Sequence, residues 1–167
     1  MNYPAQHAYD RKGLLNEVLQ QFRLNKNGVH GPNHWARVRH HGMTIGSQIG
    51  AELLVVELFA FLHDSQRFDE DEDPLHGERA AEYAASLNRR YFELSNTGID
   101  KLTTAIRSHS DGYVHQCPTI QTCWDADRLD LGRVGIKPRA KYLSSSATEH
   151  IEEAYKWSRQ RENVDLG

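Results

Sequence analysis

The chain has 167 residues, of which 38% are hydrophobic and 26% charged, a composition typical of one soluble globular domain. Its net charge of −3 gives no electrostatic footprint for nucleic acid or for an anionic membrane surface. Residues 1–12 are polar, and the longest apolar stretch, 53–62, is too short to span a bilayer. We therefore expect neither a signal peptide nor a membrane partner.

Ten histidines accompany only two cysteines, Cys117 and Cys123. Their C-x5-C spacing matches no zinc knuckle and no thioredoxin-type motif. The two cysteines are therefore interpreted as reduced thiols of a cytoplasmic protein. A bound metal would have to be held by histidine and carboxylate side chains.

Apolar residues recur with helical periodicity along nearly the whole chain. The pattern predicts a first helix over 10–24 and, after Asn-Gly and Gly-Pro turn signals, a second helix that Asn33 can cap and that ends near residue 50. A third helix over 51–64 is apolar on almost all sides, which predicts that it is the central one. A line of three glycines on the second helix indicates close packing against a neighbour: Gly42, Gly46 and Gly50.

The remaining helices follow an acidic loop over 65–73. Pro74 favours the start of a fourth helix that runs to about Leu94. Further helices are predicted over 99–110, from about 118 to 131 and over 147–161, with an irregular basic segment, 132–146, before the last. No two adjacent segments alternate like a half-buried hairpin. We therefore predict an all-α fold, a single-domain bundle of about six to seven helices over 1–167.

Five of the predicted helices place ionisable side chains on their apolar faces. These are His34 on the second, His63 and Asp64 at the end of the third, His76 on the fourth, His109 at the end of the fifth and Asp127 on the sixth. Burial of so many such groups without partners would be very unfavourable, and a shared cation would satisfy them together. Imidazole and carboxylate ligands suit Zn, Mn, Fe or Co better than Mg alone or Ca.

Other polar residues receive supporting or surface roles. Asp125 and Asp130 lie beside the centre of the stripe that contains Asp127, where they could hold ligands in place from behind. His41 is interpreted as a surface residue in preference to a support for a ligand. The other histidines are expected in loops or on the surface: His7, His30, His40, His115 and His150.

Three local patterns, in this order, resemble the HD-domain superfamily of metal-dependent phosphohydrolases. They are Gly-Pro-Asn-His-Trp-Ala-Arg-Val at 31–38, Phe-Leu-His-Asp at 61–64 and Asp-Ala-Asp-Arg-Leu at 125–129. The resemblance covers about residues 10–135 and implies an all-α bundle. It also implies that one divalent transition metal, Mn, Fe, Co, Ni or Zn, is bound by four residues: His34, His63, Asp64 and Asp127.

Some members of this superfamily hold a second metal with histidines that lie between the His-Asp pair and the last aspartate. His76 and His109 occupy that interval, although the spacing from Asp64 to His76 is short for the familiar two-metal members. A second metal is therefore left open.

The resemblance implies hydrolysis of a nucleotide or another small phosphoester by a metal-activated water, with Asp64 as a ligand that also orients the water. Arg37 lies one turn after His34, and Arg67 lies three residues after the His-Asp pair. Both arginines are predicted to contact phosphate, because a guanidinium group can bind two phosphate oxygens at once.

The acidic run at 69–73 lacks the residue spacing of an EF-hand. It is interpreted as a solvated rim of the site, with Glu70 or Asp73 as a candidate general acid for the leaving group. Ordinary surface salt bridges are favoured for Arg79 and Arg128.

Two other functions remain open. One is a non-haem di-iron oxygenase on the same fold, with His76 and His109 at the second iron. The other is a metal-stabilised binding module without turnover. The chain lacks the G-x-S-x-G, H-E-x-x-H and P-loop motifs of other hydrolases and nucleotide-binding proteins. The expected partner is a small phosphorylated substrate, and a homodimer is left open.

Overall fold

The structure, a computed structural model, describes residues 9–160 and 162–167. Over these residues the chain forms eight α-helices, two short 3₁₀-helices and no strand, which confirms the all-α prediction. His7 and Arg161 lie outside the described residues. The α-helices are α1 (Arg11–Gln21), α2 (Pro32–Ile49), α3 (Leu53–Leu62), α4 (His76–Leu87), α5 (Asn96–Arg107), α6 (Pro118–Leu129), α7 (Ser145–Thr148) and α8 (Ile151–Ser158). The 3₁₀-helices are η1 (Asp130–Val134) and η2 (Ala140–Tyr142).

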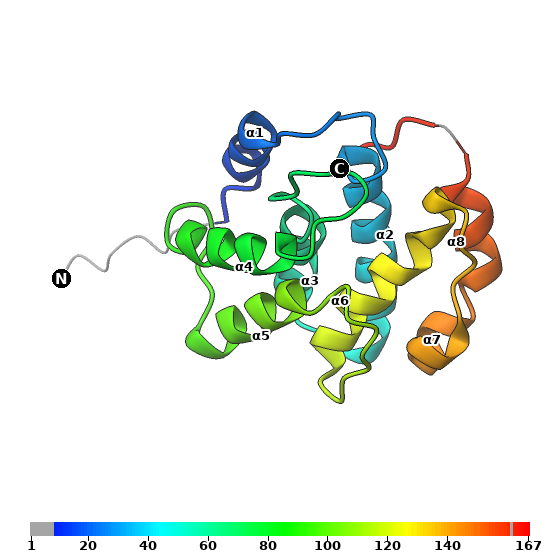
Figure 1. Cartoon of the computed structure of the whole chain (residues 1–167). Helices are drawn as coiled ribbons and strands as arrows, with labels where there is room; N and C mark the ends of the chain where they lie inside the picture. Colours follow the sequence, from blue (N-terminus) through cyan, green and yellow to red (C-terminus); the bar gives the residue numbers. More distant parts are fainter. Residues whose placement is uncertain (1–8, 161) are drawn as a thin grey trace.

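Helix α3 forms the centre of the bundle. All residues from Val55 to Leu62 are buried, and the helix contacts α1, α2, α4, α5 and α6 (Figure 1). A helix surrounded in this way is expected to be apolar on almost all sides, which is the pattern that the sequence shows; the exception, Glu57, is paired with Arg11 and Arg39. The prediction that this segment is central is confirmed.

Helices α2 and α3 approach closely at Gly42. A Cβ atom added at Gly42 would lie 2.5 Å from Cγ1 of Val56. Only glycine fits this approach without a shift of the helix axes, so close packing accounts for its place in a helix interior. This approach brings His34, on the first turn of α2, toward the carboxyl end of α3.

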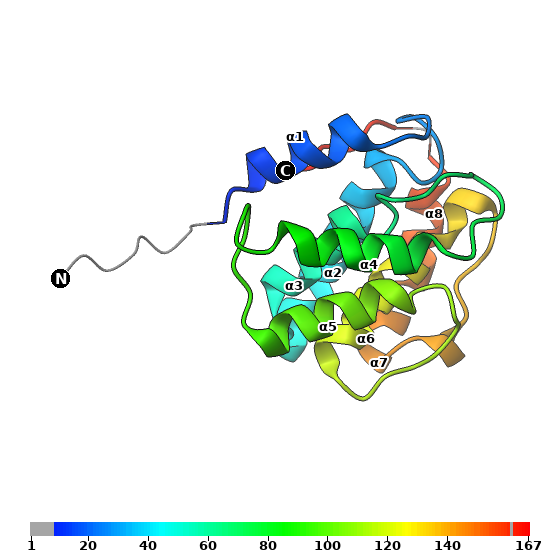
Figure 2. The same cartoon turned by 60° about the vertical axis from the view of Figure 1, so that its left-hand side comes forward.

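Helices α4 and α5 lie side by side across one face of the molecule (Figure 2). Their close approach is at Gly77, where an added Cβ would lie 2.7 Å from the carbonyl oxygen of Arg107. Because His76 precedes Gly77 and His109 follows α5 by two residues, this approach also brings the two histidines together.

Several predicted helix ends differ from the observed ones. Helix α4 ends at Leu87 instead of Leu94, because Arg89 takes a positive φ of 67° and the side chain of Asn88 accepts a hydrogen bond from the Leu94 amide. The last predicted helix is divided into α7 and α8. These local turns depend on backbone conformations that hydrophobic periodicity does not detect.

The predicted cap of α2 is also different. The N-cap is Gly31, and Pro32 occupies the first helical position. The side chain of Asn33 instead accepts a hydrogen bond of 2.9 Å from the amide of Val164. Asn33 therefore connects the start of α2 to the last described segment of the chain.

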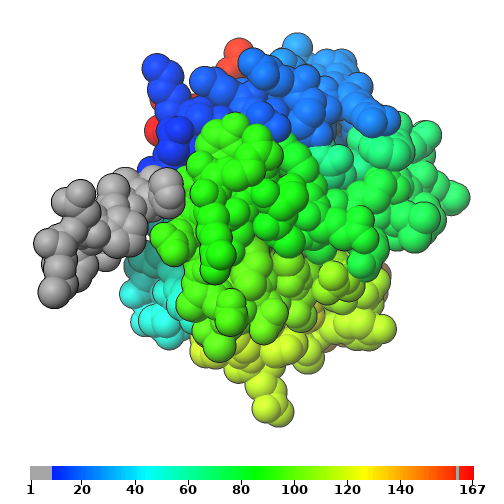
Figure 3. Space-filling model, turned by 90° about the vertical axis from the view of Figure 1, so that its left-hand side faces the viewer, coloured from blue at the N-terminus to red at the C-terminus, as the bar shows by residue number. Residues whose placement is uncertain are grey.

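The surface over α4 and α5 is bordered by α1 on one side and by the segment that leads into α6 on the other (Figure 3). Residues near the C-terminal end of the chain lie against α1, where Arg11 donates hydrogen bonds to the carbonyl oxygens of Leu166 and Gly167. Among the described residues, no helix combines the length and apolar character needed to cross a membrane.

Candidate metal centre

Four side chains that the sequence singled out converge on one point inside the bundle. His34 comes from the first turn of α2, His63 and Asp64 directly follow α3, and Asp127 lies in the last turn of α6. The Nε2 atom of His34 lies 3.0 Å from Nε2 of His63, 3.4 Å from Oδ2 of Asp64 and 3.3 Å from Oδ1 of Asp127. Nε2 of His63 lies 3.4 Å and 3.5 Å from the same two carboxylate oxygens.

A second cluster adjoins the first through the other oxygen of Asp64. Oδ1 of Asp64 lies 3.5 Å from Nε2 of His76 and 3.4 Å from Nε2 of His109. The two histidine Nε2 atoms are 2.9 Å apart. Asp64 therefore directs one oxygen to each cluster, an arrangement in which one carboxylate could bridge two cations.

All four histidines present the same nitrogen to these clusters. In each ring Nδ1 is bonded to an oxygen elsewhere in the protein, which fixes the ring and the tautomer and leaves the Nε2 lone pair for a ligand. The bonds are His34 to Asp130 Oδ2 (2.6 Å), His63 to the Phe59 carbonyl (3.0 Å), His76 to the Asp73 carbonyl (2.5 Å) and His109 to the Ile106 carbonyl (2.6 Å).

The charges of the first cluster are strongly coupled. Burial disfavours the imidazolium form of His63, but the carboxylates of Asp64 and Asp127 outweigh this effect and raise the pKa of His63 to about 10. Burial alone would raise the pKa of Asp64, whereas His63 and the other neighbouring histidines lower it well below its ordinary value. A proton on His63 therefore supplies positive charge beside the two carboxylates. A bound divalent cation would displace this proton and supply the positive charge instead.

The donor set fits such a cation. A tetrahedral ion with bonds of about 2.1 Å holds its ligand atoms about 3.4 Å apart, close to the separations within the first cluster. In the second cluster, burial and the adjacent His109 lower the pKa of His76 to about 4, so its ring is neutral near pH 7 and can act as a ligand. Nitrogen and carboxylate donors together suit transition metals better than Mg alone or Ca.

A pocket of about 470 Å³ opens onto both clusters. Asp64, Asp127 and His109 line it together with the cationic side chains of Arg67 and Arg133. Nη1 of Arg67 lies 3.3 Å from Nδ1 of His76, and its Nε atom is buried without a protein partner in the described chain. Arg67 thus stands beside the second cluster, as the prediction of a phosphate contact requires.

Arg37 has a different place from the predicted one. Its Nε and Nη2 atoms donate hydrogen bonds of 2.6 and 3.1 Å to the two oxygens of Asp130. Asp130 in turn bonds Nδ1 of His34, as the sequence suggested for a residue behind the ligands. Arg37 does not line the pocket at the metal clusters, so it positions His34 through Asp130 and does not contact a phosphate group there.

Glu70 lies behind His30, which itself lines the pocket. Oε2 of Glu70 is 2.7 Å from Nδ1 of His30. His30 lies in the turn before α2, as expected of a loop residue, but only 7% of it is exposed, so it is not a surface histidine. The other candidate acid, Asp73, already accepts hydrogen bonds from the Phe68 amide and from Arg79.

Two residues near Asp127 have structural roles. Asp125 accepts hydrogen bonds from Gln121 and from the amide and hydroxyl groups of Ser144. It therefore anchors the 140–144 segment and does not support a candidate metal ligand from behind, as had been expected. Arg128 donates to the carbonyl oxygens of Tyr113 and Tyr142, where a salt bridge was expected.

The predicted salt bridge of Arg79 is present, with Asp73. His41 is buried, contrary to expectation.

Besides His30, the sequence missed Arg133 as a residue of the pocket. It lies in η1, six residues after Asp127, and its Nη2 atom is 4.0 Å from Oδ1 of that aspartate. The sequence placed it in an irregular basic segment. Only the turn of η1 after α6 brings it back to the pocket, so no periodic signal could have identified it.

Comparison with known proteins gives one solved structure to set beside these observations. A crystal structure of a predicted HD superfamily hydrolase from an uncultured Thermotogales bacterium matches 88% of this chain and 86% of its own, with a TM-score of 0.68 and 25% sequence identity. No protein-family model and no curated protein sequence matches the chain. The fold of this protein is HD-domain-like, as the three sequence patterns implied.

Proposed function

We propose that this protein is a metal-dependent phosphohydrolase that acts on a nucleotide or another small phosphoester. The observation that carries the proposal is the pair of ligand clusters joined by Asp64. They open into a pocket whose described lining includes three arginines, Arg67, Arg128 and Arg133. The structural likeness to a predicted HD superfamily hydrolase supports hydrolysis as the class of reaction. Cytoplasmic location and a homodimer stay predictions from the sequence.

The contacts support a ligand assignment. His34, His63, Asp64 and Asp127 would hold one divalent transition metal, and His76 and His109 would hold a second with the other oxygen of Asp64. When bound, such a metal lowers the pKa of a coordinated water, so that the water can attack phosphorus near neutral pH.

The arginines and His30 complete the proposed site. Arg67 and Arg133 would offset negative charge on the non-bridging phosphate oxygens as it develops. His30 lines the pocket with Nδ1 paired to Glu70, and burial lowers its pKa, so its ring is neutral near pH 7. It would orient a substrate group or a water at the pocket wall and would not protonate the leaving oxygen. This gives Glu70 the role of orienting His30 and not of direct proton donor.

The test is phosphate release from a panel of nucleotides and simple phosphoesters in the presence of Mn²⁺, Co²⁺ or Ni²⁺. We expect wild-type protein to release phosphate and Asp64→Asn to lose this activity. Arg90→Gln, a change at an exposed residue outside the pocket, is the control and should keep it. If no compound in the panel is cleaved while the protein still binds metal, the binding module without turnover is the better function.

The second cluster also favours one alternative, a di-iron oxygenase. The observation is that His76 and His109 lie within 2.9 Å of each other beside Asp64, which suits two adjoining irons. Protein purified from iron-rich medium separates the two functions. Two irons per chain with an oxygen-dependent absorption band, and no phosphate release with any metal, would establish the oxygenase and reject the hydrolase.

A further inference from the structure

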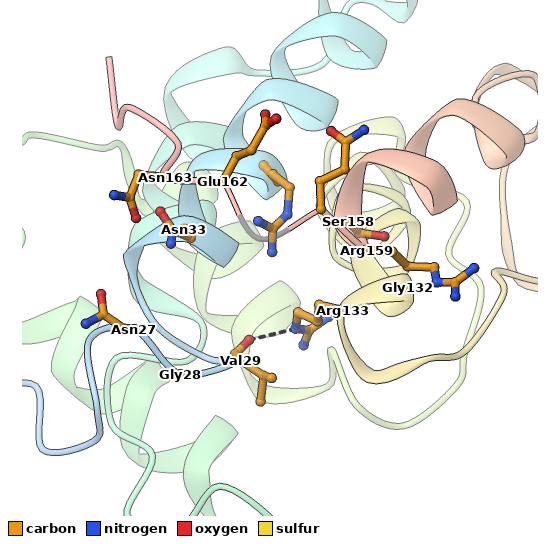
Figure 4. Close-up of a pocket in the computed structure, with 12 residues that line it drawn as sticks. Asn27, Gly28, Val29, Asn33, Gly132, Arg133, Ser158, Arg159, Glu162 and Asn163 are labelled. Carbon is orange, nitrogen blue, oxygen red and sulfur yellow. Dashed lines mark hydrogen bonds between the residues drawn. The ribbon is translucent and has the colours of Figure 1, made fainter.

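A second pocket, of about 620 Å³, lies on the other side of Arg133 from the metal centre. It opens between the loop that leads into α2, the turn of η1 and the end of α8 (Figure 4). We call it the arginine pocket, since Arg37, Arg133 and Arg159 line it. None of the candidate metal ligands lines it, so it is a separate feature.

The lining of the arginine pocket is cationic, although Asp130 behind it is ion-paired with Arg37 and Asp127 with Arg133. Among the described residues, three arginines and one acidic side chain, Glu162, line it, and the other polar side chains of the lining are neutral, with Asn33 and Asn163 among them. Helix α2 begins here without a side-chain cap, so the positive end of its dipole adds to the same field. The net positive charge contrasts with the net charge of −3 for the whole chain.

Two of the arginines are held in place by hydrogen bonds, and Nη1 of Arg37 makes no hydrogen bond to the described residues. Arg37 is 5% exposed, and Asp130 binds its Nε and Nη2 atoms but not Nη1. Arg133 donates from Nε to the carbonyl of Val29 (Figure 4) and from Nη1 to the carbonyl of Asp130, and its Nη2 lies 4.0 Å from Oδ1 of Asp127, toward the metal centre. The guanidinium groups of Arg37 and Arg133 therefore need no reordering before an anion binds beside them, so little conformational entropy is lost.

We propose that the arginine pocket binds a phosphate group that is distinct from the one attacked at the metal centre. Guanidinium groups in fixed orientations bind phosphate through two donors at once, and amide side chains can complete the hydrogen bonds. The phosphate is either the distal group of a substrate that reaches past Arg133 or a group of a separate ligand. Both sources require the same pocket chemistry.

The position of this site connects it to the metal centre. A phosphate on Arg37 would share the guanidinium group that holds Asp130, and Asp130 holds the ligand His34. Arg133 lines both pockets, and its Nη2 lies 4.0 Å from Oδ1 of Asp127. An anion in the arginine pocket would therefore change the electrostatic environment of two ligands of the first cluster, His34 and Asp127.

The primary test is calorimetric titration of metal-free protein with pyrophosphate, which needs no hydrolysis. We expect Arg159→Gln to weaken binding about tenfold, because it removes one charged donor, and Glu162→Gln to tighten it. Arg90→Gln is the matched control: Arg90 is exposed and lies 5.4 Å from the Tyr91 ring, as Arg159 lies 5.2 Å from the Tyr155 ring. Equal dissociation constants in all four proteins, or an equal loss in Arg90→Gln, would overturn the proposal.

Kinetics with metal-loaded protein then identifies the source of the phosphate. A substrate that spans both pockets predicts a higher KM in Arg159→Gln for substrates with two or more phosphates and an unchanged KM for monophosphates. A separate ligand predicts unchanged KM values for both and a rate that depends on added pyrophosphate. If the protein hydrolyses nothing, the titration still decides the arginine pocket, so the two proposals fail separately.

Discussion

Asp64 is the residue on which both ligand clusters depend, because each of its oxygens serves one of them. We expect Asp64→Asn to reduce metal binding at both clusters, since an amide is a weaker ligand and carries no charge. His76→Gln should affect only the second cluster and leave about half of the wild-type metal content. Metal analysis of protein purified without chelator checks both, with circular dichroism as the control for folding. Full metal content in Asp64→Asn would contradict the assignment.

The burial of His41 predicts that the stability of the protein depends on pH. Burial lowers the pKa of His41 to about 4, compared with its ordinary value of 6.5. Between these two values the unfolded chain binds a proton that the folded protein does not bind, so the free energy of unfolding falls as the pH falls through this window. The loss amounts to about 3 kcal/mol, because one pH unit corresponds to about 1.4 kcal/mol.

His41→Leu should weaken this dependence, because leucine does not titrate and Nε2 of His41 is buried without a partner in the described chain. The measurement is urea unfolding at pH 7 and pH 4.5 for both proteins. His115→Leu, at an exposed position, is the control and should keep the wild-type dependence. A variant His41→Leu with the same loss as wild type would show that other groups cause it.

At the scale of elements, the approach of α4 to α5 places the second cluster. Gly77→Ala would bring Cβ to 2.7 Å from the Arg107 carbonyl and force the helices apart. Because His76 and His109 lie at the facing ends of these helices, we expect the second metal to be lost and the first to be kept. Metal content should fall from about two per chain to about one.

The control for this change is Glu82→Ala on the exposed side of α4. It removes a charged side chain from the same helix without a change in the α4–α5 distance, so metal content should stay at the wild-type value. An equal decrease in both variants would show that the effect is a general loss of stability of α4.

The order and type of the elements could largely be predicted, while their ends could not. The apolar faces of α2 and α6 follow a regular helical period, and this period directs His34 and Asp127 inward. The end of α4 depends on the left-handed conformation of Arg89, and the cap of α2 depends on a contact between Asn33 and the distant Val164. Neither feature is encoded in hydrophobic periodicity.

At the scale of the whole molecule, metal should contribute to stability. Buried carboxylates and imidazoles from five helical regions meet in the ligand clusters, and a bound cation would relieve their unfavourable desolvation. A metal at about 100 times its dissociation constant stabilises the folded state by about 2.7 kcal/mol. For a chain of this length, we expect chelation to lower Tm by roughly 5 to 10 °C.

Differential scanning calorimetry with and without EDTA measures this shift, and added Mn²⁺ or Co²⁺ should reverse it. The Asp64→Asn variant should show a much smaller change. A wild-type Tm that does not respond to chelation or to added metal would contradict a bound metal at these clusters.

The sequence by itself determined the helical class of the fold and the six candidate ligands that face its interior, although not every buried polar residue. Both depend on a period of 3.6 residues, a local property that is read within one segment. The tertiary structure decided which oxygen of Asp64 meets which histidines, that Arg37 binds Asp130, that His30 pairs with Glu70 and that Arg133 reaches the pocket. These contacts join residues far apart in the chain or on either side of a turn, and they depend on how closely the helices pack at Gly42 and Gly77.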